Sequence, residues 1–353
     1  MLTREQVLVK KIKEWTESSY IGDDCAVLAD GKLVSSDTLV DGTHFRLDFA
    51  NWRQLGWKSC AVNLSDIAAM AGRPRYLTVA LTLPAQIENL EENLEQFYLG
   101  FTQCAKAYGA EVVGGDLTVG PHLVVNVTAI GESHEDGLLL RSGAQPGDVV
   151  IVSGNFGSSA AGLQLLLQGA SDNNAGIPGS SSSSSSSSSS VDEREELLLA
   201  HLEPSPRLCE AWALARLVGS RGALMDASDG LGDALWQIAE QSKVDIEVDL
   251  ETIPLSSAMI SYAISVGADP YQWALYGGED YELVATISPD DWLKAQLQPG
   301  ESFPFKKIGV VLASQPQASK IEMESGRVRL LATDASTKTV AGVVNLSNCF
   351  KHF

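Results

Sequence analysis

The sequence predicts a mixed α/β fold in two domains, on three observations. In both halves of the 353-residue chain, short runs rich in β-branched residues alternate with longer runs whose apolar residues recur at helical spacing. A turn-rich segment, RSGAQPGD at 141–148, separates the halves. A hydrophobic content of 44% is typical of a globular protein with sizeable cores. We therefore expect an N-terminal domain over residues 1–140 and a C-terminal α/β domain over 141–353.

The first half predicts four strands and two helices. KLVSSD is an apolar run that ends in polar residues, and YLTVALTLP is rich in β-branched residues and stopped by Pro84. Two long segments carry apolar residues at helical spacing, and the second is closed by Gly109. The expected elements are strands at 32–37, 76–84, 110–116 and 122–132, and helices at 52–72 and 89–109.

The second half opens with a strand, DVVIVSG at 148–154, and a small-residue segment at 155–169. That segment fits a close approach of backbone to a ligand, and it fits the tightly packed start of a helix equally well. An uninterrupted serine run, Ser180–Ser190, cannot bury apolar surface, and we expect a disordered loop over about 171–192. The remaining expected elements are helices at 192–202 and 209–219, a strand at 244–250 and further helix before the segment WALYGGEDYELVATI at 273–287.

Charge and cysteine content narrow the function. The formal net charge of −20 repels phosphate backbones and anionic lipid, so we expect neither a nucleic-acid nor a membrane partner. Five cysteines without C-x-x-C spacing favour a reducing compartment over a disulfide framework or a zinc site. The first fifteen residues contain no apolar signal-peptide core, and we expect a cytoplasmic protein.

Aspartates recur in one local context, in which an apolar run is followed by small or polar residues and then by a carboxylate. One such aspartate is usually a helix cap or a turn residue. Several of them, brought together at converging strand ends, would repel one another unless hard cations such as Mg²⁺ compensated the charge. The set comprises Asp23, Asp24, Asp37, Asp66, Asp116, Asp226 and Asp229. Asp233, one turn beyond Asp229, is interpreted as an ordinary first-turn carboxylate of a helix.

Several familiar chemistries lack their motifs here. The chain has no P-loop, no protein-kinase catalytic set, no G-x-G-x-x-G after a strand and no G-x-S-x-G elbow. Paired glycosidase carboxylates stay compatible with the spacing, but they do not explain so many aspartates beside glycine and serine turns. A nucleotide bound here would need its phosphates neutralised by metals on aspartates, which suits phosphoryl transfer.

The ordered motifs resemble those of thiamine-monophosphate kinase, in the superfamily of aminoimidazole ribonucleotide synthetase and selenophosphate synthetase. The matching segments are IGDDCAVL, SSDTLVDGTHF, AVNLSDIAAMAGRPRYLTVALTLP, VVGGDLT, LLRSGAQPGD, PSPR, DASDGL and YGGEDYEL, in family order over nearly the whole chain. The resemblance implies ATP-dependent phosphorylation of thiamine phosphate to thiamine diphosphate by direct, Mg²⁺-assisted transfer. It also implies a two-domain fold and a homodimer formed through the N-terminal domains.

The resemblance also implies the site residues, and no side chain among them is a nucleophile. The implied metal ligands are Asp24, Ser35, Ser36, Asp37, Asp66, Asp116, Asp226 and Asp229. The implied ATP contacts are Tyr98, Gly115, Asp116, Arg141 and Ser228, with core packing as an equal reading of Tyr98. His44, Glu279 and Phe350 would contact thiamine phosphate.

The chain departs from the family pattern at two places. Leu117 and Val119 follow Asp116 where the family has threonine and arginine, which removes a possible phosphate contact, and Cys349-Phe350 replaces a Gly-Tyr pair. Two rival functions remain: another ATP-dependent synthetase of the superfamily, or a silent nucleotide-binding scaffold. NLSDIAAM and GGEDYEL favour the kinase over the first, and the retained aspartates argue against the second.

Overall fold

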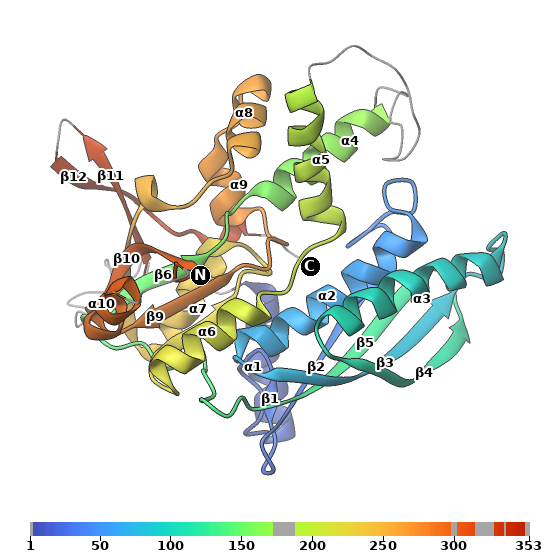
Figure 1. The fold of residues 1–353 in the computed structure, drawn as a ribbon, viewed down its shortest axis with the longest axis horizontal. Helices are drawn as coiled ribbons and strands as arrows, with labels where there is room; N and C mark the ends of the chain where they lie inside the picture. The colour runs from blue at the N-terminus through green and yellow to red at the C-terminus, as the bar shows by residue number, and fades with distance from the viewer. Residues whose placement is uncertain (1–2, 172–187, 298–301, 315–327, 335–336, 350–353) are drawn as a thin grey trace.

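Two mixed β-sheets form the framework of the computed structural model (Figure 1). The structure describes residues 3–171, 188–297, 302–314, 328–334 and 337–349. The first sheet has the strand order β1-β2-β5-β3-β4, in which only β3 and β4 are parallel neighbours. Its strands are β1 (Ala26–Val27), β2 (Lys32–Val40), β3 (Arg73–Leu83), β4 (Glu111–Val119) and β5 (Val124–Glu132). The predicted strands of the first half are confirmed.

Helices α2 (Trp52–Ala69) and α3 (Leu90–Ala107) cover one face of this sheet (Figure 1). They approach closely at two glycines: a Cβ on Gly56 would lie 1.9 Å from the Phe97 carbonyl oxygen, and one on Gly100 would lie 1.9 Å from that of Arg53. Helix α2 also contacts β7 and α6 of the second half, so it is buried nearly all round. Its residues are therefore fixed between the two sheets.

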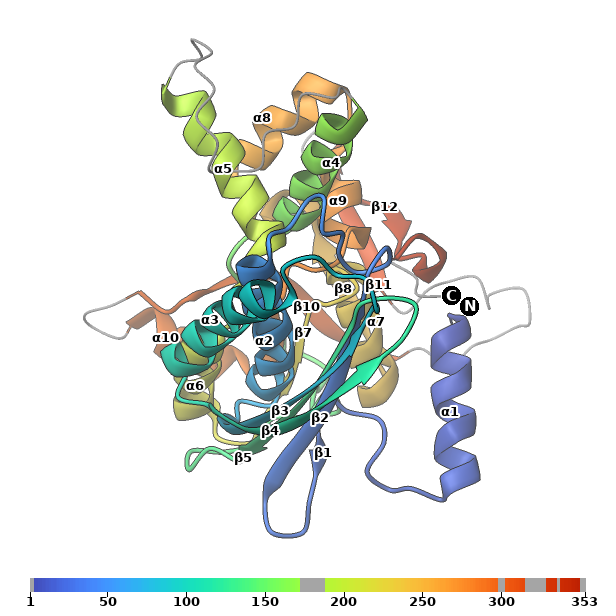
Figure 2. The same cartoon turned by 90° about the vertical axis from the view of Figure 1, so that its right-hand side faces the viewer.

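The opposite face of the first sheet has no helix over it among the described residues (Figure 2). Pairing registers arrange its side chains in rows across the strands. One row is apolar, Val34, Ile130 and Tyr76, and the central rows are polar, such as Ser36, Thr128 and Thr78. Tyr76 is 46% exposed, and β4 forms an open edge. Such a face and edge are features that a partner usually covers.

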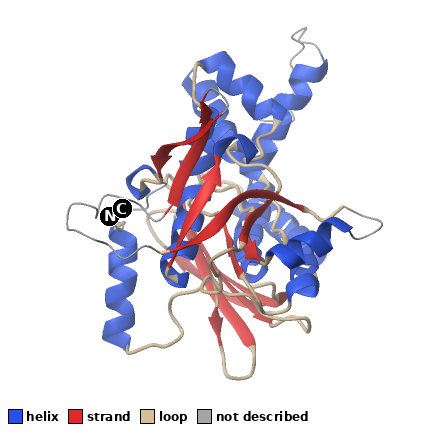
Figure 3. Cartoon of the chain, turned by 90° about the vertical axis from the view of Figure 1, so that its left-hand side faces the viewer, coloured by secondary structure: helices blue, strands red, loops and turns tan. Residues whose placement is uncertain are grey.

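The second sheet has the order β12-β11-β8-β10-β6-β9-β7. Its strands are β6 (Val149–Ser153), β7 (Ala223–Asp226), β8 (Val244–Asp249), β9 (Leu283–Ile287), β10 (Phe305–Ala313), β11 (Val328–Asp334) and β12 (Thr337–Val343). The helices of this half are α4 (Ser158–Ser171), α5 (Ser188–Leu202), α6 (Leu208–Val218), α7 (Leu231–Ser242), α8 (Ser257–Val266), α9 (Pro270–Tyr276) and α10 (Pro289–Leu297). Helices α4, α5 and α8 project together from one end (Figures 1 and 3).

The two halves share a continuous core. Buried residues of α2 and the first sheet pack in one cluster with Leu208 and Leu214 of α6 and Leu283 of β9. Helix α1 (Arg4–Thr16) has no buried residue and lies against the second half, where Gln6 donates a hydrogen bond to Asp233 at 3.1 Å. The division at residue 140 therefore stays a prediction, since one core spans it.

The serine-rich region differs from the expected loop at both ends. Helix α4 continues to Ser171, and α5 begins at Ser188, so the last serines of the run are helical. The physical reason is that helix propagation is less costly than nucleation, and DEREELLLAHL nucleates a helix that extends backwards into serine. The predicted disorder at 172–187 lies outside the described residues. Within the described ranges, no helix is both long and apolar enough to cross a membrane.

Candidate metal and phosphate site

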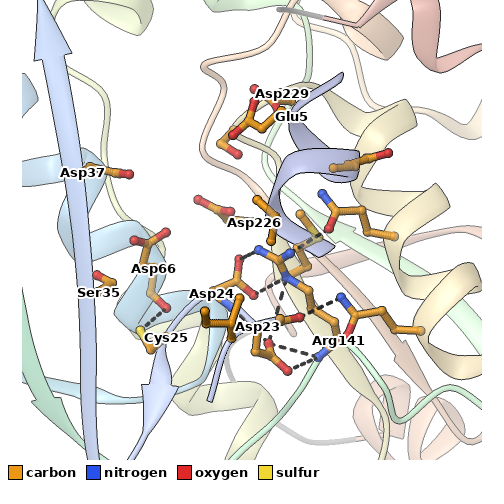
Figure 4. Close-up of a pocket in the computed structure, with 18 of the residues that line it drawn as sticks. Glu5, Asp23, Asp24, Cys25, Ser35, Asp37, Asp66, Arg141, Asp226 and Asp229 are labelled. Atoms are coloured by element: carbon orange, nitrogen blue, oxygen red, sulfur yellow. Dashed lines mark hydrogen bonds and ion pairs between the residues drawn. The ribbon is translucent and has the colours of Figure 1, made fainter. Parts of the chain in front are cut away.

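A cavity of about 860 Å³ lies between α1, β2, α2, the end of β7 and the start of α7 (Figure 4). It collects most of the predicted site residues from segments far apart in the chain. The predicted residues that line it are Asp24, Ser35, Ser36, Asp37, His44, Asp66, Arg141, Asp226, Ser228, Asp229 and Glu279. Asp23, which belongs to the recurring aspartates but has no role implied by the resemblance, and Glu5, which was not predicted, line it too.

Three carboxylates meet in this cavity. Asp24 precedes β1, Asp66 is on α2 and Asp226 ends β7, and each offers an oxygen within 4.8 Å of those of the other two. Beside them, the buried Ser35 Oγ has no partner by hydrogen-bond geometry among the described residues. An all-oxygen donor set of this kind, with a buried hydroxyl beside it, fits Mg²⁺.

The electrostatics of the cluster favour binding of a cation. Burial, followed by the charge of Asp24, raises the pKa of Asp226 to about 7. Burial raises the pKa of Asp66 well above its usual range, and the charge of Asp37 adds to the effect. At the far side of the cavity, burial with Asp233 and Glu5 raises the pKa of Asp229 to about 8 (Figure 4). The carboxylates are thus desolvated and mutually repelling, which is the arrangement that a divalent ion relieves.

Arg141 is the cation that the chain itself places among these carboxylates. Its Nη2 and Nε atoms donate to the two Asp24 oxygens at 2.7 and 3.0 Å, and its backbone N–H donates to Asp23. Its Nη1 donates to Gln237 on α7 at 2.7 Å. Burial alone would lower the pKa of Arg141, but the Asp24 carboxylate raises it above its usual value. Arg141 therefore orients Asp24 by a bidentate pair, a role beyond the predicted phosphate contact.

Two loops of the second half are joined at the cavity by their backbones. The Glu279 N–H donates to the Ser228 carbonyl at 2.6 Å, and the Ala227 N–H donates to the Glu282 carbonyl at 2.8 Å. Glu279 and Tyr281 both have positive φ, 58° and 52°, a conformation that costs free energy for residues other than glycine. These bonds hold the DASDG and GGEDYE turns, and hence the predicted nucleotide and substrate residues, in one rigid unit.

His44 and Glu279 lie where the first cavity meets a second one. This second cavity, of about 270 Å³, is lined by apolar side chains that include Phe49, Leu163 and Leu202. Lys58 of α2 and His201 of α5 line it as well, and both contact Glu279, at 3.2 and 3.3 Å. Sequence reasoning missed both residues. The available signal was a lysine on the otherwise uncharged stretch LGWKSCAVNLS of a core helix.

Gly115, Asp116 and Tyr98 are not brought to the cavity within this chain. The register places Asp116 in a row with Ala80, Asn126 and Thr38, on the uncovered face of the sheet. Three strand spacings, about 14 Å, separate β4 from β2.

Tyr98 packs edge-on against Phe97, with ring centroids 5.2 Å apart, which agrees with the core-packing reading. Ser36 borders the cavity, but its hydroxyl donates to the Val127 carbonyl and accepts from Thr128 on β5. Phe350 lies outside the described residues.

The prediction that the aspartates follow strand ends is wrong for three of them. Asp37 lies within β2, Asp116 within β4 and Asp66 within α2. The ladder with β5 continues past Asp37 to Val40, so polar residues do not end the strand there. Only Asp226 ends a strand, and the cluster forms because α2 passes between the two sheets.

Comparisons with known proteins agree with this geometry. Residues 22–133 match the family model "AIR synthase related protein, N-terminal domain". The thiamine-monophosphate kinase of Bacillus subtilis (strain 168) is 35% identical over 320 residues, which is 88% of this chain and 90% of the relative. The solved structure of AaThiL complexed with AMPPCP and TMP superposes with a TM-score of 0.78 at 29% identity, covering 100% of this chain and 99% of that one. The solved structure of hydrogenase maturation protein HypE superposes with a TM-score of 0.61 at 18% identity, covering 90% of each chain. At this identity the similarity indicates a shared fold and nothing more.

Proposed function

The chain belongs to the thiamine-monophosphate kinase family, whose reaction is the ATP-dependent phosphorylation of thiamine phosphate to thiamine diphosphate, and we propose that the carboxylate cavity is where this chain performs it. The observation that carries the proposal is the convergence of Asp24, Asp66 and Asp226 beside the buried Ser35 hydroxyl. Asp37 and Asp229, which line the same cavity, would complete the ligands for several Mg²⁺ ions. When bound, the ions would neutralise phosphate charge and align the transferred group.

The chain's own residues would orient the reactants. Arg141 holds Asp24 and points its guanidinium into the cavity, so it stays close to the phosphates as well as to the ligands (Figure 4). Ser228 lines the cavity in the turn before α7, where it would contact the nucleotide. His44 and Glu279, at the junction of the cavities, would hold thiamine phosphate.

No side-chain nucleophile is needed for this reaction. An oxygen of the thiamine phosphate attacks the γ-phosphorus, the bond from that phosphorus to the β-phosphate oxygen breaks, and ADP leaves. Positioning and charge neutralisation supply the catalysis in such a transfer. The acceptor is tested by incubating the protein with Mg-ATP and either thiamine phosphate or free thiamine. We expect thiamine diphosphate and ADP from the first only; ATP turnover with another acceptor alone would reassign the substrate.

We also propose a homodimer formed through the uncovered face of the first sheet. The apolar row of Val34, Ile130 and Tyr76 and the open edge of β4 are the support for this interface. An isologous contact would cover the same face on both subunits. A cytoplasmic location agrees with the cysteine content, five residues without C-x-x-C spacing.

Replacing Ile130 with Asp is expected to give monomers, because it places a charge at the centre of the apolar row. Size-exclusion chromatography with light scattering measures the mass. The matched control is Ile264→Asp on α8, where the isoleucine is 74% exposed and no packing is lost. The control should remain dimeric. A wild-type monomer, or an unchanged mass for Ile130→Asp, would contradict the interface.

For Asp116 and its neighbour Gly115 we propose a role in the site of the partner subunit. Asp116 and the Ser36 hydroxyl both belong to the uncovered face, so a dimer through that face brings Asp116 of one subunit towards β2 of the other. Mixing inactive Asp116→Asn and Asp226→Asn proteins should then restore about a quarter of wild-type activity, since half of the dimers gain one intact site. Mixed dimers without activity would place Asp116 in its own subunit's site.

A further inference from the structure

Lys58 is a buried cation that contacts both residues assigned to thiamine phosphate. Its side chain is 3% exposed, and its Nζ donates to Glu279 Oε2 at 3.2 Å and to the His44 carbonyl at 3.4 Å. His44 and Glu279 come from loops 235 residues apart in sequence. One ammonium group on α2 therefore joins the two loops at the junction of the cavities. It lines the second cavity and is absent from the lining of the metal-binding one.

The charges around Lys58 leave Glu279 ionised and fixed. Burial would raise the pKa of Glu279, but the charge and hydrogen bond of Lys58, together with His201 and His44, hold that pKa below the usual value. Burial and Lys58 lower the pKa of His201 to about 3, so its imidazole is neutral near pH 7. The His201 Nδ1 lies 3.3 Å from Glu279 Oε2 and 3.1 Å from the Ser159 hydroxyl. Lys58 is thus the cationic partner in this group, and it sets the direction of the carboxylate.

We propose that Lys58 is a positioning residue for thiamine phosphate: it holds the Glu279 carboxylate and the His44 loop at the cavity junction so that they can recognise the organic part of the substrate. This inference rests on the proposed function, because Lys58 would orient His44 and Glu279, the residues proposed there to hold thiamine phosphate. Lys58 is about 2.2 helical turns from Asp66 on α2, too far along the helix to act on the metals. Its removal should therefore affect one substrate and not the other.

The test is the steady-state kinetics of Lys58→Met with each substrate varied in turn. We expect the KM for thiamine phosphate to rise at least about tenfold and the KM for ATP to change less than about twofold. Lys58→Arg keeps a buried cation paired with Glu279, so it is the folded variant if Lys58→Met does not fold. We expect Lys58→Arg to raise the same KM by a smaller factor, since a planar fork cannot reproduce both contacts.

Two further variants separate positioning from stability. Arg221→Met breaks another ion pair to a buried carboxylate, that of Asp148, far from the cavities, and it should lower the melting temperature without a selective KM change. On a Glu279→Gln background, Lys58→Met should add less than about twofold to the KM, because its partner is already gone.

The outcomes are distinguishable. If the wild-type protein makes no thiamine diphosphate, the proposed function fails and this inference falls with it. If the wild type is active but Lys58→Met and Lys58→Arg keep the wild-type KM for thiamine phosphate, the inference alone is overturned. It is equally overturned if both KM values rise together, or if the two substitutions act additively.

Discussion

Asp226→Asn is expected to lower kcat by at least about 10²–10³-fold, because it removes one of the charged side chains of the proposed metal site. The side chain is buried and accepts a hydrogen bond from Ser65 at 2.5 Å, which the asparagine oxygen can also accept. The variant should therefore fold and dimerise normally. Turnover of thiamine phosphate under saturating Mg-ATP measures the effect.

The same variant should be more stable than the wild type without metal. The folded-state pKa of Asp226 is about 7, above its unfolded value, so the folded protein binds an extra proton between about pH 4 and pH 7. Metal-free stability consequently falls as the pH rises through this window. The advantage of Asp226→Asn should be small near pH 4 and on the order of 2–4 kcal/mol at pH 8. Urea unfolding of both proteins with a chelator present measures this difference in stability. With excess Mg²⁺, the wild type should become the more stable protein.

Asp233→Asn is the matched control for the catalytic effect. Asp233 is also buried near the cavity, but it accepts hydrogen bonds from Gln6 and Gln237 as a first-turn residue of α7. Its substitution should reduce kcat less than about fivefold. Near-normal turnover in Asp226→Asn, or equal losses in both variants, would contradict the assignment of the metal ligands.

Arg141→Met should destabilise the metal-free protein by about 3–5 kcal/mol and abolish turnover. The substitution leaves the buried Asp24 carboxylate without its bidentate partner in a cavity already rich in negative charge. Arg141→Lys keeps the charge but loses the fork, and it should recover part of the stability and little of the activity. Urea unfolding and initial rates are the measurements.

Arg46→Met is the stability control for Arg141. Arg46 forms the same kind of bidentate pair with Asp48, but both side chains are about half exposed, at 47% and 53%. Its loss should cost less than about 1 kcal/mol, as is usual for exposed pairs. A cost for Arg141→Met no larger than that for Arg46→Met would show that the buried pair does not organise the site.

Much of the fold was predictable because its elements are locally encoded. Strands β2, β3 and β5 and helices α2 and α3 have clear periodicity, and their ends in the structure lie within a few residues of the predicted ones. The start of α5 at Ser188 was not predicted. The loop was predicted from the serine composition of the run, which does not show that the following helix extends back into its last serines. The small-residue segment after β6 proved to be α4, the packing alternative.

Most of the predicted site residues line one cavity, but the geometry that brings them together was less predictable. Motif order placed Asp24, Asp66 and Asp226 together, but no local pattern shows that a helix between two sheets delivers Asp66. Lys58 escaped notice because its meaning depends on Glu279, more than two hundred residues away. Asp116 was grouped with the other ligands, yet the sheet register separates it from them within one chain.

Incubation with ATP radiolabelled at its γ-phosphate decides whether these carboxylates carry out a direct, metal-assisted transfer. We expect the label in the terminal phosphate of thiamine diphosphate, and only when Mg²⁺ is present. Acid-quenched samples taken during turnover should contain no labelled protein. The Asp226→Asn variant should transfer no label. Label bound covalently to the protein, or undiminished transfer by Asp226→Asn, would contradict the mechanism.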